Sequence, residues 1–352
     1  MKLRVGVVGV GPTWETRHRP ALRALSDRYE VRAVCEQVGH RAEQVAREFD
    51  ATAVDGFRAL AAREDIDAIL LLSRQWFGVL PIFAACDAGK AVYSAVGLEL
   101  DLEQANRLRD RIEQSGVAFM GEFPRRHAPA TIRLKELIAT RLGPPKLLFC
   151  HMRIPAEAPA VRRPHCEPPD GRNELVEMVD WCRYVVGRDA TSVFGLTHTA
   201  GDDPESDYQM MTLDFAAGGG PCTSATAQIS CGRYMPVEWL EAVTFRPPAA
   251  LQVACEQGIA FIDLPSTLIW FDRAGRHMEA LDSERPVGEV LLAQFHRSVT
   301  SLIRNTGSLE DAFRALSVVD AARRSHREGR RVPLEWPAGA AREGQEAGEP
   351  AA

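Results

Sequence analysis

The sequence of 352 residues predicts an α/β protein with an amino-terminal doubly wound parallel sheet and a carboxy-terminal α+β domain whose sheet is open and mainly antiparallel. Two observations predict this class. Short apolar runs alternate with helical patterns as far as about residue 123, which is typical of parallel βαβ units. Beyond that point strand-like runs follow one another with turns between them. We therefore expect one domain at residues 1–123, a second at 124–337 and a disordered tail at 338–352.

The first domain begins with a strand at residues 3–8, because Val5, Val7 and Val8 make both of its faces apolar, as in a buried parallel strand. Further strands are predicted at residues 29–35, 53–54, 67–72, 91–94 and 117–120. Helical spacing of apolar residues separates them at residues 40–49, 57–63, 80–88 and 102–115.

The second domain opens with a predicted helix at residues 128–140, which ends before the turn-forming residues 143–145. Strands are expected at residues 146–154, 191–199, 209–215, 222–230, 238–245, 251–255 and 260–264. A helix at residues 173–186 interrupts them, and helices at 287–305 and 309–328 follow.

A glycine-rich turn with Gly9 and Gly11 follows the first strand. Without a Cβ the backbone can turn sharply and let a pyrophosphate approach, while the N–H groups of the next helix point at the anion. The pattern predicts a Rossmann cradle for a dinucleotide, but Trp14 stands where the fingerprint has its third glycine, so an ordinary strand–turn–helix remains the alternative. The predicted cofactor-binding residues are Gly9, Gly11, Pro12, Thr13, Trp14, Glu36, Ser73, Gln75, Trp76 and Gly97.

Glu36 predicts which dinucleotide binds. It ends the second predicted strand, close to the distance from the glycine turn at which a carboxylate hydrogen-bonds the adenosine ribose hydroxyls. A carboxylate there repels a 2′-phosphate. We therefore expect NAD rather than NADP.

The composition argues against several classes of function. A net charge of -6 gives no electrostatic basis for binding nucleic acid or an anionic membrane surface. No apolar run reaches the roughly 18 residues of a membrane-spanning helix, and the chain begins directly with a strand rather than with a signal peptide. We expect a cytoplasmic protein.

The cysteines and histidines do not predict a metal site. The eight cysteines are scattered without CxxC spacing, which is typical of free thiols in a reducing compartment. The pairs Cys150-His151 and His165-Cys166 match no zinc-binding spacing.

Stretches along nearly the whole chain resemble one family. The matching stretches are the opening turn with residues 18–22, then residues 65–69, 88–90, 134–138, Asp180 with Arg183-Tyr184 and Gly187, and residues 257–263. The most specific match is residues 321–334, Ala-Ala-Arg-Arg-Ser-His-Arg-Glu-Gly-Arg-Arg-Val-Pro-Leu, which resembles the family's last helix and the strand after it. On these residues the chain is identified as a member of the glucose-fructose oxidoreductase / inositol dehydrogenase / rhizopine catabolism (Gfo/Idh/MocA) family.

The resemblance implies a Rossmann domain, an open sheet that often mediates dimers or tetramers, and a hydride exchanged between nicotinamide and a sugar, cyclitol or related carbonyl. The family's Glu-Lys-Pro motif supplies a lysine near the reacting oxygen, but here Ala95, Val96 and Gly97 stand at those positions. The family's active-site histidine is replaced by Glu177, whereas the aspartate three residues later, Asp180, is retained.

Two interpretations follow from these departures. In the first, the protein is an active oxidoreductase in which Glu177 and Asp180, one helical turn apart, form a carboxylate pair whose mutual repulsion raises one pKa, and a carboxylate takes the proton from an alcohol. In the second, the fold and the NAD pocket remain while the chemistry is lost, leaving a regulatory or partner protein.

The substrate is predicted to be a small sugar-like or polyol molecule. Arg126 and His127 follow the last strand of the first domain, where the family places an arginine near substrate, and Arg163 and His165 lie in the proline-rich loop before the predicted active-site helix. The alternatives are surface charges, a salt bridge from this segment to Glu122, and a solvated loop.

Overall fold

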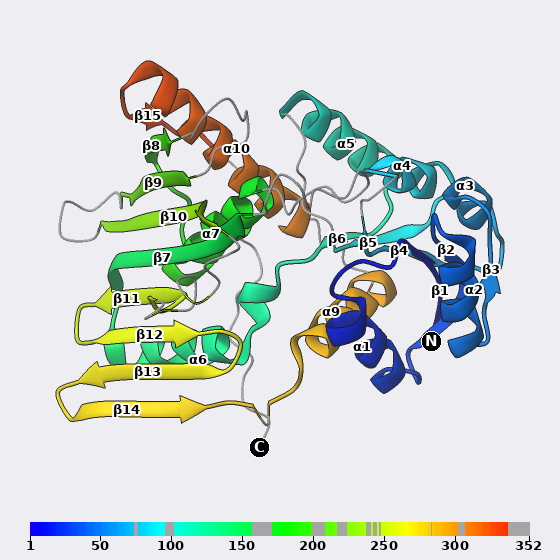
Figure 1. Ribbon diagram of the computed structural model, residues 1–352, viewed down its shortest axis with the longest axis horizontal. Coiled ribbons are helices and arrows are strands. Elements are labelled where there is room, and N and C mark those ends of the chain that lie inside the picture. The colour runs from blue at the N-terminus through cyan, green and yellow to red at the C-terminus, as the bar shows by residue number, and fades with distance from the viewer. Residues whose placement is uncertain are drawn as a thin grey trace.

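The computed structural model describes residues 1–73, 77–95, 102–156, 171–198, 208–216, 224–236, 241, 245, 248–282, 284–301 and 307–336. Two sheets organise these residues (Figure 1). One is parallel and six-stranded, and the other has nine strands. This arrangement confirms the predicted fold class.

The parallel sheet has the strand order β3-β2-β1-β4-β5-β6, so successive strands are added outward from β1 to β3 and then, from β4 on, on the other side of β1. Every neighbouring pair in it is parallel. Ligands of such sheets bind outside the carboxyl ends of the strands at the point where the strand order changes sides. The strands are β1 (Leu3–Val8), β2 (Tyr29–Cys35), β3 (Thr52–Ala53), β4 (Ala68–Leu71), β5 (Ala91–Ser94) and β6 (Phe119–Gly121).

Helices cover both faces of the parallel sheet. They are η1 (Trp14–His18), α1 (Arg19–Ala24), α2 (Gly39–Glu48), α3 (Phe57–Ala61), α4 (Leu80–Asp87) and α5 (Leu102–Ser115). A helix from near the end of the chain, α9 (Val287–Thr300), packs against α1 and η1, so the first domain is completed by a late segment (Figure 1). The buried Tyr29 hydroxyl donates a hydrogen bond of 2.6 Å to the Leu292 carbonyl across this contact.

The nine-stranded sheet has the order β14-β13-β12-β11-β7-β10-β9-β8-β15, and all its pairs are antiparallel except β7 with β10. Its strands are β7 (Pro145–Ala156), β8 (Ser192–His198), β9 (Tyr208–Phe215), β10 (Ala225–Pro236), β11 (Leu251–Cys255), β12 (Ile259–Asp263), β13 (Thr267–Asp272), β14 (Gly275–Ala280) and β15 (Val332–Pro333). The hairpin of β13 and β14 is not among the predicted strands, and β14 is an edge strand whose sequence lacks an alternating apolar pattern.

Helices cover one face of this sheet. They are α6 (Pro129–Leu137), which continues into η3 (Ile138–Leu142), α7 (Gly171–Val186) and α10 (Gly307–Glu328). A short helix, η2 (Pro124–His127), links β6 to α6. On the opposite face large apolar side chains remain exposed, among them Leu147, Phe194, Leu196, Phe271 and Met278.

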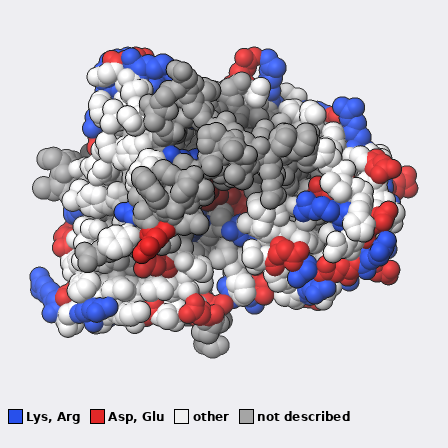
Figure 2. Space-filling model, in the orientation of Figure 1, with Lys and Arg blue, Asp and Glu red and all other residues white. Residues whose placement is uncertain are grey.

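Three expectations from the sequence concern the charge of the surface, membrane-spanning helices and metal binding. Figure 2 shows acidic and basic side chains intermixed over the coloured part of the visible face. None of the helices in the described ranges has the length and apolar character needed to cross a bilayer. Within the same ranges no three His, Cys, Asp or Glu side chains are grouped so that they could hold a metal ion.

Some of the predicted features lie outside the described residues. They are His165 and Cys166, most of the predicted strand at 238–245 and all of residues 337–352.

Candidate active site

The glycine turn follows β1 and packs on the residues just after β4. It therefore lies where the order of the strands changes sides, between β1 and β4. Gly9 has a φ of +74°, and a Cβ at Gly11 would lie 2.3 Å from the Leu72 carbonyl oxygen. A Cβ at Gly9 would lie 2.8 Å from that of Ser73. Both positions therefore require glycine for the turn to pack against Leu72 and Ser73. Close packing of the protein itself thus explains the glycines, and the same geometry presents the turn at the carboxyl edge of the sheet.

The Glu36 carboxylate reaches across to this turn. Its Oε2 accepts a hydrogen bond of 2.5 Å from the Val10 backbone N–H, and its Oε1 accepts one of 3.1 Å from Gln37 N–H. Arg41, in the first turn of α2, donates to the Val10 carbonyl at 3.2 Å. A carboxylate and a guanidinium therefore bond the two peptide groups that flank Val10, in the region where Rossmann folds bind the adenosine ribose.

Trp14 does not block the turn. Its side chain is 2% exposed and contacts Phe49 edge to face at 5.8 Å, so the ring belongs to the core. The chain accommodates the ring in a widened helical turn, because Arg17 N–H and His18 N–H both bond the Thr13 carbonyl at the start of η1. A cofactor contact of Pro12, Thr13 or Trp14 stays a prediction.

Glu177 lies on α7 opposite the segment that leaves β6. Arg125 donates from Nε to Glu177 Oε2 at 3.1 Å and from Nη2 to Glu174 Oε2 at 2.8 Å. Burial raises the pKa of Glu177 to about 7, Arg125 opposes this rise, and the neighbouring Glu174 adds to it. The Glu177 side chain is 21% exposed. It is therefore accessible and changes its charge near neutral pH.

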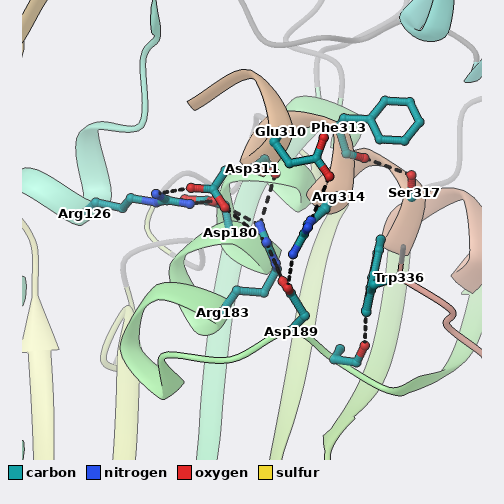
Figure 3. A network of polar contacts seen from close by, with 11 residues as sticks. Arg126, Asp180, Arg183, Asp189, Glu310, Asp311, Phe313, Arg314, Ser317 and Trp336 are labelled. Atoms are coloured by element: carbon teal, nitrogen blue, oxygen red, sulfur yellow. Dashed lines mark hydrogen bonds and ion pairs between the residues drawn. The ribbon is translucent and has the colours of Figure 1, made fainter. Parts of the chain in front are cut away.

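Asp180 has a different environment one turn further along α7 (Figure 3). Arg126 holds it with two hydrogen bonds, one of 2.5 Å from Nε to Oδ2 and a second from Nη2 to Oδ1, and Arg183 lies 3.5 Å away on the other side. The side chain is 1% exposed. Burial raises the pKa of Asp180, and the two guanidinium groups oppose that rise. Asp180 therefore belongs to an ion-pair network.

The network continues from Arg126 and Arg183 into α10 (Figure 3). Arg126 Nη1 donates to Asp311 at 2.7 Å, and Arg183 donates to Asp189 and Asp311. Arg314 of α10 also pairs with Asp189. These contacts join η2, α7 and α10.

One detail of the predicted carboxylate pair is wrong. After burial, the acids that raise the pKa of Glu177 most are Glu174 and then Glu122, rather than Asp180. The alternative of a salt bridge to Glu122 is not formed by Arg126, since the Glu122 carboxylate is bonded to Arg17, His18 and Tyr93. The sequence contained a signal for Glu174, since it lies three residues before Glu177 on the same helix.

The predicted substrate residues are placed only in part. Arg126 is engaged by Asp180 and Asp311, and its contact with a substrate stays a prediction. Burial and the charge of Arg126 lower the pKa of His127 to about 4, so this ring is neutral at neutral pH. Gln75, Trp76, Gly97, Arg163 and His165 lie outside the described residues.

Comparison with known families identifies the amino-terminal unit. The model of an oxidoreductase family with an NAD-binding Rossmann fold, Gfo/Idh/MocA, matches residues 3–123. The amino-terminal unit is therefore similar to the Gfo/Idh/MocA family. The matched residues include β1, the glycine turn, Glu36 and β6, so the family match and the geometry of the turn concern the same edge of the sheet.

Two named relatives match part of the chain. Inositol 2-dehydrogenase of Cereibacter sphaeroides is 27% identical over 230 residues, which are 62% of this chain and 65% of the relative. A dTDP-3,4-didehydro-2,6-dideoxy-α-D-glucose 3-reductase of Actinomadura kijaniata is 30% identical over 141 residues, 39% of this chain and 41% of the relative. The chain thus spans 41–65% of the length of these two relatives.

Solved structures show that the fold extends over both sheets. Aldose–aldose oxidoreductase from Caulobacter crescentus superposes with a TM-score of 0.78 at 15% identity, covering 95% of this chain and 100% of that one. An oxidoreductase from Thermotoga maritima also gives 0.78, at 18% identity, with 95% and 98% covered. At this identity the likeness shows the fold alone.

The described residues fit the nicotinamide dinucleotide that the family model implies. The positive φ of Gly9, the packing of Gly11 and the Glu36 carboxylate beside Val10 together form the edge of a Rossmann site. Ser73, 8% exposed, lies just beyond the end of the neighbouring strand β4. This chain differs from the family motif at Ala95, which follows β5 at the position where the motif has its glutamate.

Proposed function

We propose that this chain is an NAD-dependent oxidoreductase that acts on a sugar, cyclitol or related polyol, with Glu177 as its proton-transferring group. The observation that carries the proposal is the partly exposed Glu177 carboxyl with a pKa of about 7. A group that is half ionised near neutrality can take a proton from an alcohol and return it to a developing alkoxide. The names of the two relatives, an inositol dehydrogenase and a dTDP-sugar reductase, support this substrate class.

Arg125 positions the proposed proton acceptor. It lies in η2, directly after the strand β6 whose carboxyl end borders the cofactor edge, and it bonds Glu177 and Glu174 together. When bound, the nicotinamide exchanges the hydride. Ionised Glu177 accepts the hydroxyl proton as an alcohol is oxidised, and protonated Glu177 supplies it in the reverse direction. Asp180 acts as a positioning residue, because it holds Arg126 next to Arg125 in the same short helix.

A substrate screen tests the function. We expect a panel of sugars and cyclitols with NAD to include compounds that change the absorbance at 340 nm, and the Glu177→Gln variant to lose this activity. NAD binding without turnover for any compound would instead favour the second candidate, an NAD-binding regulatory or partner protein. The observation that favours this candidate is Val96, which replaces the family's lysine and cannot transfer a proton.

The cofactor preference depends on Glu36 in this proposal. We expect Glu36→Ala to weaken NAD binding roughly tenfold, because a hydrogen bond to a charged group is lost, and to improve NADP binding, because Arg41 remains beside the turn. Glu43→Ala on the exposed face of α2 is the matched control. Titration calorimetry with both cofactors measures the change. Equal affinity of the unaltered protein for NAD and NADP would contradict the role of Glu36.

We also propose that two copies associate through the open face of the nine-stranded sheet. The exposed apolar residues of that face lie on β7, β8, β13 and β14, so they extend along most of the sheet. An exposed apolar surface of this kind is typical of a subunit interface. Light scattering should give a mass above that of one chain, and a monomer would contradict the proposal.

A further inference from the structure

Glu122 forms a buried polar cluster that the proposed chemistry does not use. The residue directly follows β6, and its side chain is 2% exposed. Its carboxylate accepts hydrogen bonds of 2.9 Å from the Tyr93 hydroxyl and pairs at 2.9 Å with His18 Nε2, and it also pairs with Arg17. Burial alone would raise the pKa of Glu122, but His18, Arg17 and Tyr93 together lower it below its ordinary value. The carboxylate is therefore ionised at neutral pH.

One side of this cluster reaches the glycine turn. Arg17 and His18 end η1, and the N–H groups of both residues donate to the Thr13 carbonyl, at 2.9 and 3.3 Å. His18 Nδ1 also lies 3.4 Å from the Thr13 hydroxyl. Thr13 is the last residue of the turn before η1. A displacement of the turn on binding a diphosphate would therefore move the groups that hold Glu122.

The other side of the cluster reaches the proposed proton acceptor. Glu122 N–H donates to the Ser94 carbonyl at 2.8 Å, which continues the pairing of β5 and β6 by one residue. Three residues later Arg125 leaves the same segment and bonds Glu177. The charge of Glu122 also raises the pKa of Glu177, as does that of Glu174 from α7, whereas Arg125 from η2 lowers it.

We propose that Glu122 is a positioning residue that couples the glycine turn to the Arg125–Glu177 ion pair. The coupling rests on the proposed function for its cofactor, since NAD is the ligand of the turn. A cluster that only stabilised the fold would not need to join these two places. Instead, a single carboxylate is bonded to residues of the turn's helix and lies on the segment that carries Arg125.

The variant Glu122→Gln tests the coupling by two independent measurements. Titration calorimetry should show NAD affinity reduced roughly 3- to 30-fold. Nuclear magnetic resonance with ¹³Cδ-labelled glutamate follows the titration of Glu177, whose signal is identified by its loss in Glu177→Gln. The Glu177 midpoint should fall in Glu122→Gln, because a nearby negative charge is removed.

Asp67→Asn is the matched control. Asp67 forms a carboxylate–arginine pair with Arg4 in the same domain, next to the amino-terminal ends of β1 and β4, away from the turn. We expect neither NAD affinity nor the Glu177 midpoint to change in this variant. If Glu122→Gln lowers only thermal stability and moves neither measurement, Glu122 is structural and the proposal is overturned.

The variant Tyr93→Phe and the NAD affinity of the unaltered protein decide two further cases. If Glu122→Gln does not fold, Tyr93→Phe removes one hydrogen bond from Glu122 without changing a charge, and NAD affinity should fall roughly 2- to 10-fold. Unchanged affinity in that variant would also overturn the proposal. If the unaltered protein does not bind NAD, the proposed function fails, whereas an unchanged Glu177 midpoint in Glu122→Gln specifically overturns the coupling.

Discussion

Two neighbouring ion pairs join the same two elements, η2 and α7, yet they have opposite properties. Arg125 and Glu177 form the first, and the Glu177 side chain is 21% exposed. Arg126 and Asp180 form the second, and the Asp180 side chain is 1% exposed. Asp180 has two guanidinium partners, whereas Glu177 shares one guanidinium with a second acid, Glu174. One turn of helix thus separates a carboxylate suited to proton transfer from one suited to holding the fold.

The largest expected effect is on turnover at the first pair. Glu177→Gln keeps the shape of the side chain but cannot accept a proton, so we expect turnover to fall by about 10²- to 10⁴-fold. NAD affinity should change little, because the glycine turn proposed to bind the cofactor follows β1, whereas Glu177 lies on α7. Steady-state kinetics with a substrate from the screen, and calorimetry with NAD, measure the two quantities. Retained turnover would remove Glu177 from the mechanism.

The second effect is on stability at the other pair. Asp180→Asn leaves Arg126 and Arg183 buried with one carboxylate fewer, and breaking a buried pair in this way costs about 3–5 kcal/mol. The matched variant is Glu177→Gln, which we expect to cost less, because Arg125 keeps Glu174 as a partner and Glu177 is only about half ionised at pH 7. Urea denaturation at pH 7 compares them. Equal losses in both variants would show that the two ion pairs do not differ as their burial indicates.

The sequence predicted the fold better than it predicted these two environments. Periodic apolar runs and the glycine turn are local features, so the order of strands and helices in the first domain followed from them. The spacing of Glu177 and Asp180 correctly placed both on one helix. It could not show which arginine each acid meets, because Arg125 and Arg126 are adjacent in sequence and only the path of η2 directs them to different carboxylates. The partners of Glu122 were hidden for the same reason, since Arg17 and His18 lie more than 100 residues away.

The smallest expected effect concerns the cause of the raised pKa of Glu177 in the first pair. Glu177 has a pKa of about 7, so the rate of alcohol oxidation should rise with pH through about 7, as the carboxyl loses its proton, and carbonyl reduction should fall over the same range. Glu174 faces Glu177 from the same helix, Arg125 faces it from η2, and Glu122 acts from the end of β6. Glu174 is the negative charge that shares Arg125 with it.

Glu174→Gln removes that charge and leaves Arg125 bonded to Glu177 alone. Both changes favour the ionised form of Glu177, so the midpoint of the pH–rate profile should move to lower pH, by roughly one unit or less for a partly solvated pair. Glu136→Gln, whose acid pairs with Arg133 on α6, is the control and should leave the profile unchanged. A midpoint that stays near 7 in Glu174→Gln would show that burial alone sets the proton affinity of Glu177. The raised pKa of Glu177 would then not depend on its second acid.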